Sequence, residues 1–216
     1  TGQAISPAFQ LSTKLAQLKS VKGILSEMEG IASPSQESDL SASRMAEGFS
    51  DSVELRNLSL VFDDGTAGLE HINLRLKKGL HYAVIGSSGS GKSTLLRAMA
   101  GQLPYGGSVQ VNGQEISALP HRTRARLLSY LPQTLTTPDM DVYTLVSHGR
   151  FARLGLFKTL GDSDRVAIRA AMEQTGVWDL RDRSCKTLSG GQKQSAYLAM
   201  AIAQNAPYLL LDEPDT

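Results

Sequence analysis

The stretch Gly86-Ser87-Ser88-Gly89-Ser90-Gly91-Lys92-Ser93 has the spacing of a phosphate-binding loop, in which two glycines frame four residues ahead of a lysine and a hydroxyl. Glycines let the backbone turn sharply and point its N–H groups at a phosphate. A helix predicted over residues 92–100 would add its positive N-terminal end. Lys92 would neutralise charge on the outer phosphates of ATP, Ser93 would ligate Mg²⁺, and Thr94 completes the predicted nucleotide-binding set.

Upstream of this loop the sequence predicts a globular unit that begins near Val53. Residues 53–62 read as a strand, and Ile72, Leu74 and Leu76 alternate with polar residues, as in a strand with one buried face. Residues 82–85 are wholly apolar, which predicts a strand buried on both faces. After the loop, a strand over residues 108–111 ends at the hairpin turn Asn112-Gly113.

Downstream, residues 134–187 are predicted to form a helical insertion, irregular over 135–159 and helical over 164–175. Apolar residues of that helix are expected to face inward, namely Val166, Ile168, Ala171 and Met172. A second strong helix is predicted over residues 192–204.

Residues 208–211 predict a buried strand that delivers Asp212 and Glu213 to its C-terminal edge, where open α/β sheets place their ligands. Asp212 would hold Mg²⁺ through water. Glu213 would act as a general base and accept the proton of the attacking water.

The stretch Leu188-Ser189-Gly190-Gly191-Gln192 opens the helix over residues 192–204, so small residues again meet a helix N-terminus and predict a second anion site. A helix of about 13 residues is ~20 Å long, and its far end leads to the Asp212 strand. We therefore expect this site to be remote from the chain's own phosphate loop. It would instead close over the nucleotide of a second subunit in a head-to-tail dimer.

Taken together, the phosphate loop, the Leu188-to-Gln192 signature and the Asp212-Glu213 strand resemble an ATP-binding-cassette ATPase from Val53 to Thr216. The resemblance implies an α/β P-loop NTPase with an N-terminal antiparallel β subdomain and a helical insertion. It also implies that Phe62 stacks on adenine. Gln133, in Tyr130-Leu131-Pro132-Gln133, would meet Mg²⁺ and the attacking water and sense a membrane subunit.

Both ends of the chain depart from the pattern of that family. The sequence stops after the Asp212-Glu213 strand, so we expect a C-terminally truncated domain without the family's switch histidine. Residues 1–31 read as an amphipathic helix and residues 32–52 as a polar linker. These two segments resemble the junction between membrane domain and ATPase in an exporter.

The second half of the chain resembles a different branch of the family. Leu145-Val146-Ser147-His148-Gly149-Arg150 is similar to the corresponding stretch of importer ATPases that serve iron chelates, haem or cobalamin. The chain is thus either an unusual member or a join of two sources near residues 130–133. Function is expected to be ATP hydrolysis that powers iron-chelate import. The alternatives are the ATPase half of a fused exporter, a non-transport clamp protein, and a binding module without turnover.

Bulk composition limits the partners that we expect. With 22 Lys and Arg against 21 Asp and Glu, the net charge is +1, which gives no electrostatic case for nucleic acid. A single cysteine excludes an internal disulfide framework. No apolar run reaches the ~18–20 residues of a spanning helix, so a separate transmembrane permease subunit is expected. The protein would then be peripheral, on the cytoplasmic side of the inner membrane.

Overall fold

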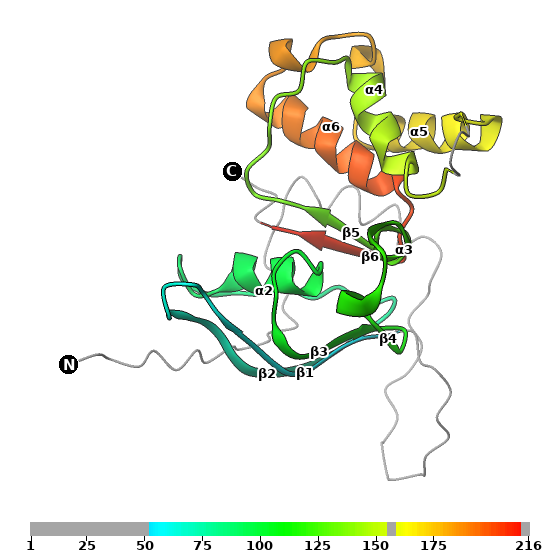
Figure 1. Ribbon diagram of the computed structural model, residues 1–216. Helices are drawn as coiled ribbons and strands as arrows, with labels where there is room; N and C mark the ends of the chain where they lie inside the picture. Colours follow the sequence, from blue (N-terminus) through cyan, green and yellow to red (C-terminus); the bar gives the residue numbers. More distant parts are fainter. Residues whose placement is uncertain (1–51, 155–158, 213–216) are drawn as a thin grey trace, which may run out of the picture.

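The computed structural model describes residues 52–154 and 159–212 (Figure 1). The predicted helix over 1–31, residues 32–51 of the predicted linker and the proposed base Glu213 lie outside the described residues. Ser52, the last residue of the predicted linker, instead begins the first strand. The elements follow in the order β1 (Ser52–Val61), β2 (Ala67–Lys77), α2 (Lys92–Met99), β3 (Gly106–Val111), β4 (Gln114–Glu115), η1 (Ile116–Ala118), α3 (His121–Leu127), β5 (Leu128–Leu131), α4 (Val142–Ser147), η2 (His148–Arg150), α5 (Asp162–Gln174), η3 (Trp178–Leu180), η4 (Cys185–Thr187), α6 (Gly190–Ala203) and β6 (Tyr208–Leu211).

Four strands form an antiparallel sheet in the order β2-β1-β3-β4. In register, Val53 of β1 lies between Leu76 of β2 and Val111 of β3. The β3–β4 connection is the predicted two-residue turn, because Asn112 and Gly113 have φ values of 52° and 77°, as a tight hairpin requires. The predicted N-terminal antiparallel β subdomain is therefore confirmed.

The remaining elements stack on this sheet in layers (Figure 1). Helix α2 buries Leu95, Ala98 and Met99 in the same apolar core as the inner face of β1 and β3. Strands β5 and β6 pair in parallel beyond α2, with Leu131 opposite Leu211, and α4, α5 and α6 pack beyond them. Because α2 lies on one side of this strand pair and α6 on the other, the ends of both helices can meet the C-terminal edge of β5 and β6.

The helical part is more regular than the sequence predicted. Residues 135–159 were expected to be irregular, but α4 and η2 lie within them. Asp141 caps α4 by accepting a 2.7 Å hydrogen bond from Thr144 N, and Val142, Leu145 and Val146 are buried at helical spacing. Both the capping aspartate and the apolar spacing are visible in the sequence, so a helix here is consistent with local chemistry.

Three sequence expectations about burial are wrong. Val166 of α5 is 68% exposed, because it lies about 200° around the helix from the buried Ile168. Residues 82–85 form no strand, and Ile85 is 54% exposed. Leu209 of β6 is 39% exposed. A strand is buried on both faces only inside a wider sheet, and within the described residues β5 and β6 pair only with each other.

No helix within residues 52–154 and 159–212 has the length and apolar character needed to cross a membrane.

Candidate nucleotide site

The glycine loop before α2 is folded tightly on itself. Ser90 N donates to Ser87 O at 3.2 Å, and a Cβ at Gly86 would overlap the hydroxyl of Ser90. Gly91 has a φ of 87°, a left-handed conformation that favours glycine, and its carbonyl accepts from Leu95 N at 2.8 Å. The loop thus turns directly into the first turn of α2, whose N–H groups face the loop.

Lys92 lies back over this loop. Its Nζ donates to the carbonyl oxygens of Gly86 and Ser87, each at 3.0 Å. Ser93 and Thr94 follow in the first turn of α2 and are half-buried. The ammonium group therefore lies against the backbone of the loop, where its charge suits a polyanionic ligand.

One hydroxyl in the loop fits a phosphate directly. Within residues 52–154 and 159–212, Ser90 Oγ is the single buried side-chain polar atom without a hydrogen-bond partner. A buried hydroxyl without a partner is costly and is usually satisfied by a ligand or water. The unpartnered hydroxyl of Ser90 therefore supports a phosphate ligand, and this support does not depend on the sequence pattern.

The carboxylate predicted to hold Mg²⁺ lies beside the loop. Ser93 Oγ donates to Asp212 Oδ1 at 2.9 Å, and Tyr130 Oη donates to Asp212 Oδ2 at 3.1 Å. Asp212 is buried, and its N–H donates to Leu131 O at 3.0 Å, extending the β5–β6 ladder by one bond. Burial and then the charge of Asp212 raise the pKa of Tyr130 to about 12, so the phenol remains a donor. Hydroxyl and carboxylate oxygens this close together are ligands that Mg²⁺ prefers.

Tyr130 is a site residue that the sequence reasoning did not assign. Parallel pairing sets Tyr130 opposite Leu210, two residues before Asp212, and this register is what brings the phenol to the carboxylate. The sequence contains no signal for the register.

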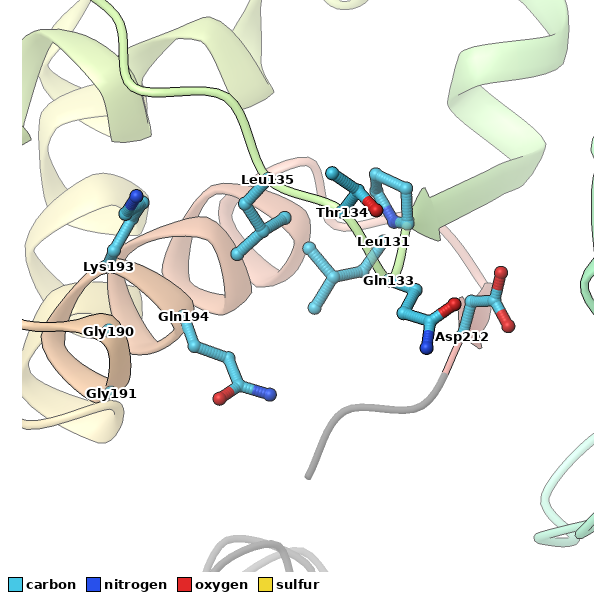
Figure 2. A pocket seen from close by; sticks show the side chains of 10 residues that line it. Leu131, Gln133, Thr134, Leu135, Gly190, Gly191, Lys193, Gln194 and Asp212 are labelled. Carbon is cyan, nitrogen blue, oxygen red and sulfur yellow. The ribbon is translucent and has the colours of Figure 1, made fainter. Parts of the chain in front are cut away.

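A cavity of about 350 Å³ opens at the same edge of the strands (Figure 2). Residues 131–135 line one wall, with Gln133 next to Asp212, and Gly190, Gly191, Lys193 and Gln194 line the other. Asp212 and the signature glycines Gly190 and Gly191 thus line one cavity, because β6 returns along α6 and brings Asp212 back toward the start of that helix.

The signature stretch is organised as a helix cap. Ser189 Oγ accepts from Gln192 N at 3.3 Å, and Gln192 Oε1 accepts from Ser189 N at 3.0 Å, a reciprocal capping box. A Cβ added at Gly190 or Gly191 would meet nothing within 4 Å. The backbone at these glycines is therefore accessible, whereas the side chain of Gln192 is used within its own helix.

Phe62, the residue predicted to stack on adenine, lies at the end of β1 and is 40% exposed. A Cβ at Gly68 would lie 2.7 Å from the Phe62 ring, and a Cβ at Gly91 would lie 3.1 Å from the carbonyl oxygen of Gly68. The ring and the phosphate loop thus contact the same residue of β2. An aromatic face beside a phosphate loop suits a nucleotide base.

Residues 69–216 match the family model of the ABC transporter, and the chain belongs to this family. It is 40% identical over 150 residues to the iron(3+)-hydroxamate import ATP-binding protein FhuC of Bacillus subtilis (strain 168), covering 68% of this chain and 56% of that one. It is also 40% identical over 149 residues to the ferric enterobactin transport ATP-binding protein FepC of Escherichia coli (strain K12), covering 68% and 55%.

Among solved structures, cbiO1 from Clostridium perfringens, part of the ABC transporter complex cbiONQ, has a TM-score of 0.63 at 26% identity. The match covers 74% of this chain and 64% of that one. This likeness and the family match confirm the predicted P-loop NTPase fold.

The chain spans about half the length of the two import proteins. An alignment of 150 residues within a chain of 216 necessarily crosses residues 130–133, so similarity to one importer continues across the position where a join was considered.

Proposed function

We propose that this chain is the ATP-binding and ATP-hydrolysing module of an importer for iron chelates. The observation that carries the proposal is the contact between Ser93 and Asp212 beside a phosphate loop that is closed over Ser90. Family membership supports ATP as the nucleotide, and the printed names of the two import proteins support an iron chelate as cargo.

Each loop residue has a distinct part in this proposal. Backbone N–H groups over residues 86–93 and the hydroxyl of Ser90 bind the phosphates, and Lys92 exchanges its carbonyl partners for phosphate oxygens. Phe62 holds the adenine ring. Ser93 and Asp212 hold Mg²⁺, which when bound neutralises charge on the outer phosphates. Gln133, which follows the end of β5, lines the cavity that Asp212 also lines.

Hydrolysis is assigned to residues next to Asp212. Glu213, outside the described residues, would accept the proton of the attacking water as a general base. The capped N-terminus of α6, with Ser189, Gly190 and Gly191, would bind the nucleotide of a second ATPase subunit and exclude water from it. The dimer would associate with a transmembrane permease on the cytoplasmic side of the membrane.

Nucleotide binding and turnover in the full-length protein test this proposal. Lys92→Ala should abolish ATP binding, whereas Lys186→Ala, which removes an exposed lysine paired with Asp139 at 2.7 Å, should leave it unchanged. Unaltered affinity in Lys92→Ala would reject the loop assignment.

Glu213→Gln should keep ATP binding, block phosphate release and trap an ATP-bound dimer. Normal turnover in this variant would remove Glu213 from the role of base.

Cargo is tested separately in cells. Deletion of the gene should abolish uptake of a radiolabelled ferric hydroxamate or catecholate and leave uptake of amino acids unchanged. Restoration of uptake by the wild type, and not by Lys92→Ala, would link import to ATP. Normal ferric-chelate uptake in the deletion strain would reject an iron chelate as cargo while leaving the ATPase assignment intact.

A further inference from the structure

Residues 148–153 pack directly on the C-terminal end of α6. A Cβ at Gly149 would overlap the carbonyl oxygen of Met200 and would lie 3.0 Å from Gln204 N. The backbone of η2 therefore touches the backbone of α6 with no side chain between them. This close approach fixes the distance between the two elements at that point.

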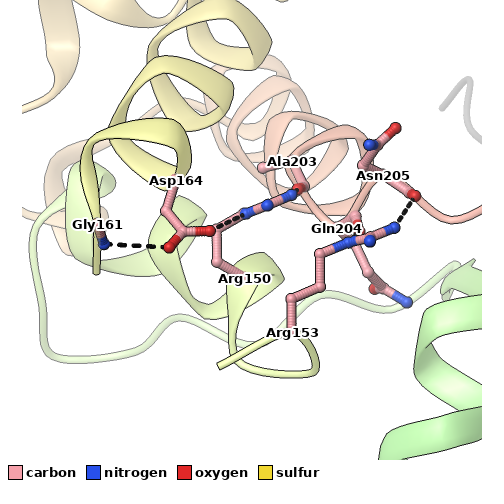
Figure 3. Close-up of polar contacts among 7 residues, drawn as sticks. All are labelled: Arg150, Arg153, Gly161, Asp164, Ala203, Gln204 and Asn205. Carbon is pink, nitrogen blue, oxygen red and sulfur yellow. Dashed lines mark hydrogen bonds and ion pairs between the residues drawn. The ribbon is translucent and has the colours of Figure 1, made fainter. Parts of the chain in front are cut away.

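Two arginines from this segment bind the last carbonyl group of α6 and the carbonyls of the two residues that follow it (Figure 3). Arg150 Nη1 donates to Ala203 O at 2.7 Å, Arg153 Nε donates to Gln204 O at 3.1 Å, and Arg153 Nη2 donates to Asn205 O. Carbonyls at a helix C-terminus lack intrahelical partners and carry the negative end of the helix dipole. The two guanidinium groups donate hydrogen bonds to these carbonyls, and their positive charge offsets the negative end of the dipole.

Arg150 also ties α6 to the start of α5. Its Nε donates to Asp164 Oδ1 at 2.9 Å, and Asp164 Oδ2 accepts from Gly161 N at 3.1 Å. The side chains of Arg150 and Asp164 are only 10% and 13% exposed, whereas Arg169 and Glu173 of the same α5 form a largely exposed ion pair. Arg150 thus joins two helices through two nitrogen atoms of its planar guanidinium group, at a position that is largely shielded from solvent.

The opposite end of α6 is the proposed nucleotide-contacting end. With 14 residues, α6 is a rod of ~21 Å, so a tilt of about 6° at its C-terminus moves its N-terminus by ~2 Å. A displacement of about 1 Å at a reacting site can cost a factor of ~100 in rate. The hydrogen bond from Arg150 to Ala203 O at one end of α6 therefore influences the positions of Ser189 and Gly190 at the other end.

We propose that Arg150 is a positioning residue that, by joining Asp164 to Ala203 O, orients α6 so that its N-terminus meets the nucleotide of the second subunit. This inference rests on the proposed function, because it assigns α6 to the composite site. Within the His148-Gly149-Arg150 stretch, Gly149 and Arg150 then serve to hold η2 against α6. His148 and Phe151 instead stack on each other with ring centroids 4.7 Å apart, and Phe151 is exposed.

The test compares Arg150→Lys with Arg169→Lys in the full-length protein. Lysine keeps the charge at position 150, but its single ammonium group cannot reproduce the guanidinium geometry to Asp164 and Ala203 O. We expect Arg150→Lys to bind ATP with wild-type affinity, within about twofold, and to lose about tenfold or more in kcat with little change in KM. Arg169→Lys should match the wild type.

Hydrogen exchange at Gln192 and Lys193, whose amides donate to the hydroxyl and the carbonyl of Ser189, gives a readout that needs no hydrolysis. We expect these two amides to exchange several-fold faster in Arg150→Lys than in Arg169→Lys, while amides of β1 and β3 remain unchanged. If the wild type hydrolyses no ATP, the proposed function fails, and this comparison still decides the positioning role. Equal exchange at Gln192 and Lys193 in the two variants overturns the inference.

A double variant separates positioning from simple stability. Arg150→Met with Asp164→Leu removes both charges and leaves no buried ion unpaired, so we expect it to fold. It lacks the bond to Ala203 O and should retain the kcat defect of Arg150→Lys. Recovery of wild-type kcat in the double variant would show that Arg150 only neutralises Asp164 and would overturn the proposal.

Discussion

The hydroxyl of Ser93 donates a 2.9 Å hydrogen bond to Oδ1 of Asp212, across 119 residues of sequence. Ser93 stands in the first turn of α2, and Asp212 follows the last residue of β6. The other carboxylate oxygen accepts from Tyr130. A phosphate loop and a strand-end carboxylate are thus in direct contact, and the two oxygen atoms proposed to hold Mg²⁺ lie within hydrogen-bond distance of each other.

Substitution of Ser93 by alanine should uncouple ATP binding from Mg²⁺. The variant loses one proposed metal ligand while the loop amides and Lys92 remain. We expect ATP affinity in Mg²⁺ to fall about tenfold, or ~1.4 kcal/mol, to the value measured with EDTA. Isothermal titration with and without Mg²⁺ measures this.

Ser117→Ala is the matched control for Ser93→Ala, because Ser117 Oγ also donates to a carboxylate, that of Glu115, at 3.1 Å. This pair is exposed and lies away from the loop, so the control should retain the full effect of Mg²⁺ on ATP affinity. Retention of that effect in Ser93→Ala would remove Ser93 from the metal site.

Alkaline pH should destabilise the protein through two tyrosines. Burial and the charge of Asp212 raise the pKa of Tyr130 to about 12, and burial and a hydrogen bond to Glu115 raise the pKa of Tyr105 to about 12. In the unfolded chain both would titrate near 10. Since the folded-state pKa is the higher one, their contribution to stability is complete below pH 10 and is lost between pH 10 and about 12.

Urea unfolding at pH 9 and pH 11.5 measures this loss. Tyr130→Phe and Tyr105→Phe should each reduce the drop in unfolding free energy between the two pH values, and the double variant should reduce it further. Only Tyr130→Phe should also alter ATP binding, because Tyr105 contacts Glu115 outside the loop. An unchanged drop in both single variants would contradict the assignment of the alkaline loss to these phenols.

The sequence was sufficient for features determined by local chemistry. The left-handed glycines before Lys92 and the Asn112-Gly113 turn each follow from residue types at fixed spacing, and each is present in the structure. The strands over residues 53–62 and 72–76 also followed from their residue patterns, whereas their antiparallel pairing was implied by the family resemblance.

What the sequence could not supply were relationships set by register and packing. Tyr130 reaches Asp212 only because β5 and β6 pair in parallel with Leu131 opposite Leu211. Helix length predicted only that Ser189 is remote from the chain's own phosphate loop. The return of β6 along α6, which brings Asp212 to the same cavity as Gly190, has no local signal in the sequence. Arg150 was recognised as part of an importer-like stretch, but its bond to Ala203 O depends on how η2 packs on α6.

Addition of a single methyl group at Gly149 should destabilise the fold. The new Cβ would overlap Met200 O, a backbone atom that cannot rotate away, so η2 and α6 must move apart. Overpacking of this kind costs about 1–3 kcal/mol. Thermal unfolding of Gly149→Ala measures the cost, with Gly161→Ala as the control, because a Cβ there lies 3.8 Å from its nearest neighbour, Asp164 Oδ2. Equal melting temperatures for the two variants would contradict the close approach.

Removal of the Phe62 ring should weaken binding of the base and spare binding of the phosphates. The ring packs on Gly68, and the carbonyl of Gly68 lies beside Gly91 of the loop. We therefore expect a nucleotide held by the loop to extend its base toward Phe62. Loss of one stacking partner is worth about 1–3 kcal/mol by analogy with base–aromatic stacking in nucleic-acid complexes. We expect Phe62→Ala to lose about tenfold in ATP affinity and nothing in affinity for inorganic tripolyphosphate, whereas Phe62→Trp should bind ATP as well as the wild type.

Phe151→Ala is the control, because Phe151 is a similarly exposed phenylalanine that stacks on His148 away from the loop. It should leave both affinities unchanged. If Phe62→Ala lost affinity for ATP and tripolyphosphate in the same proportion, the ring would be supporting the loop through Gly68 rather than binding adenine. If neither affinity changed, the base would lie elsewhere on the domain. Only a selective loss for ATP, restored by tryptophan, is the behaviour expected of a stacking surface.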